Sequence, residues 1–155
     1  MKTYIGTKIV RMKPMTRAEY NQFRGWPMPA DEDGSDEGYL VEYLDGGKPN
    51  VAGYTGYVSW SPAEQAEAAY RETSGMSFGL ATEAIKKGLR VARDGWNGKG
   101  MWVGLHCEDG VFVREACGTE LQYGNYLAIK TADNHLVPWV PSQTDMLADD
   151  WLIVE

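Results

Sequence analysis

Cysteine is scarce in this sequence, in which Cys107 and Cys117 are the only two among 155 residues. The dipeptide Asp109–Gly110 indicates a two-residue hairpin turn between strands at 101–108 and 111–116. In that register the two sulfur atoms would start about 16 Å apart at ~3.3 Å per residue, which is too far for a disulfide bond. We therefore expect both cysteines to be reduced thiols.

Histidine is equally scarce, and His106 and His135 do not complete a zinc-ligand spacing with the cysteines. The segment 31–37 has five acids in seven residues, which is typical of a solvated loop. A calcium site is the alternative there, although the loop lacks the EF-hand pattern that ends in a bidentate glutamate. Asp94 and Asp145 are available carboxylates, but no nucleophile with its base accompanies them. We predict no metal, no cofactor and no catalytic residue.

No apolar run approaches the ~20 residues of a membrane-spanning helix, and residues 1–6 lack the apolar segment of a signal peptide. The sequence thus predicts a cytoplasmic protein without membrane contact. Acidic residues outnumber basic ones by 22 to 15. The net charge of −7 disfavours nucleic acid as a partner, because such binding depends on neutralising phosphates with lysine and arginine. It still permits a small phosphorylated ligand held by a few local donors.

Hydrophobic residues make up 43% of the chain, enough for one medium domain or two small ones. The small, polar segment Thr73–Gly75 lies between two predicted helices and indicates a boundary between domains at 1–74 and 75–155. Hairpin signals dominate, and no βαβ alternation appears. We predict an α+β fold class, with two small domains that each contain an antiparallel sheet and one or two packed helices.

The N-terminal half shows signals for two helices. Thr16 and Glu19 have the spacing of a capping box, and Gly25 marks the end of that helix. Ser61 and Glu64 repeat the capping-box spacing before a second helix. The predicted helices are 17–24 and 62–72, and the predicted strands are 3–12, 39–44 and 56–60.

The C-terminal half shows one longer helix, which Ser77 should cap and Gly88 should end. A second hairpin is predicted from 126–131 and 135–139, around a turn of Ala, Asp and Asn. The remaining predicted strands are 90–93 and 151–154.

Another capping-box pattern lies within the stretch 138–151. Ser142 and Asp145 have the required spacing, with aspartate where glutamate or glutamine is usual. A short helical turn should therefore begin at Ser142 and bury Met146 and Leu147.

That turn would place polar groups beside an aromatic ring. An amide, a hydroxyl and a carboxylate next to Trp139 would suit the recognition of a nucleobase or a ribose. The alternative is a structural corner, in which Trp139 and Trp151 belong to the core and the polar residues cap the turn. The polar residues in question are Gln143, Thr144 and Asp145.

Five blocks of the sequence, 76–78, 84–88, 91–93, 95–101 and 138–151, together resemble a small phage domain. The family they resemble is the second Thoeris anti-defence family, and the resemblance covers 76–155. It implies a sponge, a protein that binds the glyco-cyclic ADP-ribose signal of a host TIR enzyme without cleaving it. Some members also take up cyclic dinucleotides. The preceding residues resemble short uncharacterised phage proteins.

The resemblance also implies a ligand site and an assembly. Lys99 is a weaker candidate for a ligand contact than the residues implied by motif position. It lies in a glycine-rich loop and could contact a phosphate there. The implied assembly is a homotetramer with pockets between protomers, acting in the cytoplasm of the infected bacterium. Two alternatives stay open: an enzyme that degrades the nucleotide signal, and a phage interaction protein without a small ligand. The ligand contacts implied by motif position are Trp96, Asn97, Trp139, Gln143, Thr144 and Asp145.

Overall fold

The computed structural model describes residues 1–96, 98–107, 112–114, 120–122 and 124–155. The chain separates into two compact units, Met1–Tyr70 and Arg71–Glu155. The boundary indicated by the sequence, after residue 74, falls a few residues beyond this division. Antiparallel sheets and helices are present in the chain, so the predicted α+β class is confirmed.

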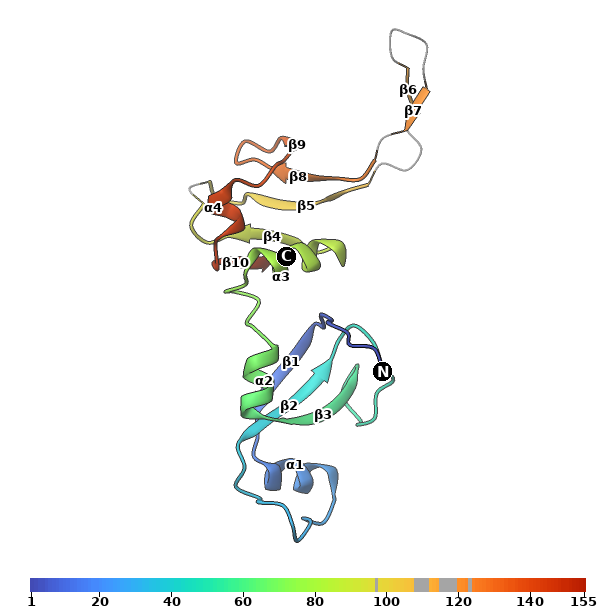
Figure 1. Cartoon of the computed structure of the whole chain (residues 1–155), viewed down its shortest axis with the longest axis vertical. Helices are drawn as coiled ribbons and strands as arrows, with labels where there is room; N and C mark the ends of the chain where they lie inside the picture. The colour runs from blue at the N-terminus through green and yellow to red at the C-terminus, as the bar shows by residue number, and fades with distance from the viewer. Residues whose placement is uncertain (97, 108–111, 115–119, 123) are drawn as a thin grey trace. The chain divides into compact units, whose positions relative to one another are not determined.

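The first unit is a three-stranded antiparallel sheet in the order β1-β2-β3, with two helices (Figure 1). Its buried core joins Tyr20 of the first helix to Leu40 and Val58 of the sheet. The capping box of Thr16 and Glu19 is confirmed, and Gly25 ends that helix in the left-handed conformation, with φ 69°. The elements are β1 (Val10–Pro14), α1 (Arg17–Arg24), β2 (Gly38–Tyr43), β3 (Tyr57–Pro62) and α2 (Ala63–Ala69).

The predicted start of strand β1, the predicted end of helix α2 and the capping box predicted at Ser61 are wrong. Strand β1 begins later than predicted, at Val10, which pairs with Tyr43, the last residue of β2. Helix α2 ends at Ala69 and has Pro62 as its N-cap, without a capping side-chain hydrogen bond. The Ser61 hydroxyl donates to the carbonyl of Pro62 instead, at 3.4 Å. A capping-box spacing is therefore insufficient when a strand continues up to the first helical residue.

The second unit is built on a five-stranded antiparallel sheet in the order β10-β4-β5-β8-β9. Strands β6 and β7 form a separate two-stranded ribbon. Ser77 is the N-cap of α3, as predicted, although its hydroxyl makes no capping hydrogen bond. The elements are α3 (Phe78–Lys86), β4 (Arg90–Arg93), β5 (Trp102–His106), β6 (Phe112–Arg114), β7 (Glu120–Gln122), β8 (Tyr126–Lys130), β9 (Leu136–Pro138), α4 (Gln143–Met146) and β10 (Trp151–Val154).

The pairing predicted around Asp109–Gly110 is wrong. Strand β5 pairs with β8, whereas β6 pairs with β7. The β5–β8 pairing brings Val103 opposite Ile129, and both side chains are buried in the core. A local hairpin signal is outweighed here by the burial of apolar side chains that are distant in sequence. Cys107 is an exposed free cysteine, and Cys117 lies outside the described residues.

The second predicted hairpin is confirmed, since β8 and β9 are antiparallel with Ile129 opposite Val137. Asn134 in its turn has a positive φ of 65°, a conformation that asparagine tolerates better than most residues.

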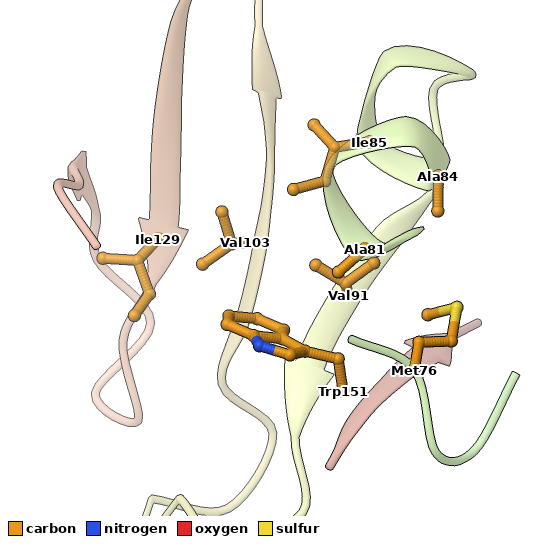
Figure 2. Close-up of a cluster of buried hydrophobic side chains, with 8 residues drawn as sticks. All are labelled: Met76, Ala81, Ala84, Ile85, Val91, Val103, Ile129 and Trp151. Atoms are coloured by element: carbon orange, nitrogen blue, oxygen red, sulfur yellow. The ribbon is translucent and has the colours of Figure 1, made fainter. Parts of the chain in front are cut away.

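The core of the second unit lies between α3 and the sheet (Figure 2). Trp151 is fully buried and is the largest side chain of this cluster. Strand β10 is fixed beside β4, where Trp151 pairs with Arg93. Met76 exchanges two backbone hydrogen bonds with Trp151, at 2.8 and 3.1 Å. The buried members of the cluster are Met76, Ala81, Ala84, Ile85, Val91, Val103, Ile129 and Trp151. Among the described residues, no helix is long and apolar enough to cross a membrane.

Candidate functional site

Three tryptophans from distant parts of the second unit meet in one cluster. Trp96 follows β4, Trp139 follows β9, and Trp151 begins β10. Their ring centroids are 5.5 to 6.2 Å apart, with interplanar angles of 70° to 76°. This edge-to-face geometry is favoured by the ring quadrupoles. Trp96 and Trp139 are only partly buried against the core, so they extend the cluster from the buried Trp151 toward solvent.

The turn α4 is fixed beside this cluster by hydrogen bonds. The capping box is confirmed: Asp145 N donates to Ser142 Oγ at 3.2 Å, and Ser142 N donates to Asp145 Oδ2 at 3.0 Å. Trp151 Nε1 donates to the carbonyl oxygen of Asp145 at 3.0 Å. Trp96, in the block 95–101 (the first tryptophan block), contacts the same residue, because its Nε1 lies 3.4 Å from Asp145 Oδ1.

The predicted burial of Met146 and Leu147 is wrong, since they are 45% and 82% exposed. The turn directs Asp145 inward, where its carbonyl meets Trp151 and its carboxylate meets Trp96. Successive helical residues are rotated by about 100°, so the next two side chains point away from the unit. Met146 and Leu147 are therefore exposed because Asp145 occupies the inward position. The hydrophobic pattern of the sequence did not indicate that a polar residue would lie there.

Arg93 holds this site together and was not among the predicted site residues. Its Nε and Nη2 lie 2.8 and 3.3 Å from the two carboxylate oxygens of Asp150. Its Nη1 lies 3.1 Å from Asp145 Oδ1 and 3.4 Å from the carbonyl oxygen of Thr144. A signal was present in the sequence. Arg93 lies two residues after Val91 and therefore on the same, core-facing side of the strand, where a charge requires partners.

The charges of this network stabilise one another. The hydrogen bonds that Arg93 donates, first to Asp150 and then to Asp145, raise the pKa of Arg93. The hydrogen bond from Arg93 is the main reason why the pKa of Asp150 lies below its usual value. Burial alone would raise the pKa of Asp145, but hydrogen bonds from Ser142, Arg93 and Trp96 outweigh that effect and lower it. Both carboxylates are therefore ionised at neutral pH.

We expect the second unit to lose stability in acid. A carboxylate whose folded pKa is lowered stabilises the fold above its unfolded pKa, about 3.9 for aspartate, and this contribution disappears as pH falls through the folded pKa. The thermal midpoint should therefore be nearly constant from pH 7 to about 5 and should fall below about pH 4. Thermal unfolding of the wild type and of Asp145→Asn measures this effect. The variant should show the smaller decrease, and parallel decreases in both proteins would contradict the assignment.

The predicted ligand residues are placed unequally. Trp96, Trp139 and Asp145 are brought together, as described above. Gln143 and Thr144 lie exposed on α4. The structure places Lys99 at the surface, three residues beyond Trp96, whereas Asn97 lies outside the described residues. Of the described residues, no group of three or more His, Cys, Asp or Glu is arranged to hold a metal ion.

The second unit matches a known protein family. A sequence model of the Thoeris anti-defense 2-like domain matches residues 76–154. The chain belongs to this family. Thoeris anti-defense 2 of Bacillus phage SP01 is 49% identical to it over 84 residues, covering 51% of this chain and 94% of that protein. The expected family is thus confirmed, and membership supports a role in phage anti-defence. All the tryptophans, carboxylates and arginine of the site lie within the matched residues.

Proposed function

We propose that this protein binds a cyclic nucleotide immune signal and holds it without cleaving it. The ligand class is glyco-cyclic ADP-ribose of the Thoeris system, with cyclic dinucleotides as further ligands. The protein would act as a sponge in the cytoplasm of the infected bacterium. The observation that carries this proposal is the pair of partly exposed indoles, Trp96 and Trp139, beside the polar turn α4.

The chemistry of these groups suits a nucleotide. An indole face stacks on any nucleobase, and base–aromatic stacking contributes about 1–3 kcal/mol per base. Gln143 and Thr144 supply an exposed amide and an exposed hydroxyl on α4, and these can read polar edges of a base or a ribose. Lys99, with the backbone amides of its glycine-rich loop, is our proposed phosphate contact, and Asn97 is a further proposed ligand residue.

Two features favour binding over cleavage. A general acid or base works best with a pKa near the operating pH, whereas the pKa values of Asp145 and Asp150 are both lowered. Both oxygens of each carboxylate also accept hydrogen bonds already. These carboxylates have a structural role in the described site. Cleavage of the nucleotide signal is therefore less well supported than binding.

We further propose a homotetramer with ligand pockets between protomers. Val140 is 86% exposed and Leu147 is 82% exposed. Val140 directly follows Trp139 in the sequence, and Leu147 lies between Trp139 and Trp151. Exposed apolar side chains that form a contiguous patch often mark a protein–protein surface. A pocket that borders this surface would be completed by a neighbouring protomer. Residues 1–74 lie outside the matched family domain, and we propose that they adjust assembly or ligand range.

We expect intact nucleotide to be released from the heat-denatured protein. The purified full chain is incubated with glyco-cyclic ADP-ribose or a cyclic dinucleotide, freed of unbound ligand and denatured, and the supernatant is analysed by mass. Trp26→Ala, at a half-exposed tryptophan of the first unit, is the matched control for changes at the site and should retain ligand normally. Altered nucleotide in the supernatant would indicate an enzyme. Recovery of no nucleotide at all would favour an interaction protein without a small ligand.

A further inference from the structure

The guanidinium of Arg93 joins three separate segments of the second unit. Arg93 ends β4, Asp150 immediately precedes β10, and Asp145 lies on α4. The side chain of Arg93 is only 20% exposed. Its three nitrogen atoms all lie within hydrogen-bond distance of acceptors on these other two segments.

Each carboxylate in this network also accepts a hydrogen bond from the first tryptophan block. Asp150 Oδ2 accepts from the backbone amide of Gly95 at 3.0 Å. Asp145 Oδ1 accepts from Trp96 Nε1. The position of Trp96 relative to α4 is therefore set through the same two anions that Arg93 holds.

We propose that Arg93 is a positioning residue for the ligand site, which fixes Trp96 and α4 in the binding geometry and does not itself bind the ligand phosphate. The inference rests on the proposed function for its ligand readout. Two carboxylates already satisfy the fork of Arg93, so one positive charge faces two negative ones and no net positive charge is left for a phosphate. A lysine would not replace it, because an ammonium cannot hold the bidentate geometry with Asp150 while reaching Asp145.

Gly95 offers a second way to disturb the network without removing a charge. A Cβ atom at this position would lie 2.9 Å from Asp150 Oδ2, closer than real Cβ contacts. Gly95→Ala should therefore displace the Asp150 carboxylate, and with it one side of the Arg93 fork.

The test compares Arg93→Met, Arg93→Lys and Gly95→Ala with the control Arg90→Met. Arg90 lies on the same strand, is exposed and stacks over Trp102, so its replacement removes the same charge on the other face of the sheet. The readouts are the thermal midpoint, the near-ultraviolet circular dichroism of the tryptophans without ligand, and the dissociation constant for glyco-cyclic ADP-ribose. The dichroism responds to the packing of the indole rings.

We expect both Arg93 variants to weaken ligand binding at least about tenfold, by analogy with residues that orient the ligands of a metal ion, and to change the tryptophan dichroism. Gly95→Ala should act in the same direction, and Arg90→Met should match the wild type in ligand affinity. If Arg93 instead binds phosphate directly, Arg93→Lys should keep most of the affinity and leave the dichroism unchanged. If it serves only stability, the folded variants should bind with wild-type affinity. Either result would overturn the proposal.

Two further outcomes are also decisive. If Arg93→Met does not fold, Arg93→Lys and Gly95→Ala provide the comparison. If the wild type binds none of the nucleotides, the proposed function fails while the positioning role is judged from dichroism alone. Unchanged dichroism in Arg93→Lys would then reject it.

Discussion

Trp139→Ala should give a folded protein that binds its cyclic nucleotide about ten- to a hundredfold more weakly. The indole is partly exposed beside α4, and its removal deletes a stacking surface worth about 1–3 kcal/mol. The ring also packs edge-to-face on Trp96 and Trp151, so we expect a smaller loss of stability alongside the loss of affinity. Titration calorimetry with glyco-cyclic ADP-ribose, together with thermal unfolding without ligand, separates the two effects.

The control for this change is Trp26→Ala, which removes the same side chain from the first unit. If Trp139 is a core residue rather than a ligand contact, Trp139→Ala should cost about 3–5 kcal/mol of unfolding free energy, and the folded fraction should bind normally. Asp145→Asn is a useful companion. Because the carboxylate caps α4 and also binds Arg93 and Trp96, its replacement should lower both affinity and stability.

Trp151→Ala should lower the unfolding free energy of the second unit by about 3–5 kcal/mol, the range for replacing a buried aromatic residue by alanine. Trp151 is fully buried and contacts Phe78, Trp96 and Trp139 through its ring. Its indole N–H also donates to the carbonyl of Asp145, so the variant loses one of the bonds that hold α4 against the core.

Denaturant unfolding followed by backbone circular dichroism measures this loss, because two compact units permit two transitions. Trp102→Ala is the matched control, since that indole is partly exposed on β5 and lies under Arg90. The control should cost less than Trp151→Ala. Equal costs for the two variants would show that the cluster around Trp151 is not the main source of stability in this unit.

The elements that could be predicted from the sequence are those whose signals are local. The capping boxes at Thr16 and Ser142 and the left-handed Gly25 depend on contacts within a few residues. The β8–β9 hairpin is local as well, because one short turn sets its register. The capping box predicted at Ser61 failed because strand β3 extends to Pro62 and leaves the Ser61 hydroxyl to a different acceptor.

The candidate site, too, could be predicted only where its residues are close in sequence. The sequence alone indicated that Trp139 and Asp145 lie near one another, because both belong to one short stretch. It did not indicate that Arg93 binds Asp150, which is 57 residues away. Such an ion pair forms only because β4 and β10 are neighbours in the sheet, and that pairing is determined by the burial of side chains such as Val91 and Trp151.

The sequence by itself thus determined the family, the α+β class and the caps and turns that begin and end individual elements. The tertiary structure decided the strand order, the exposure of Met146 and Leu147, and the charge network around Arg93. The physical reason is the range of the interactions involved. Caps and turns satisfy backbone groups within a few residues of the chain, whereas sheet order and buried charges depend on apolar and polar partners that only the folded core brings together.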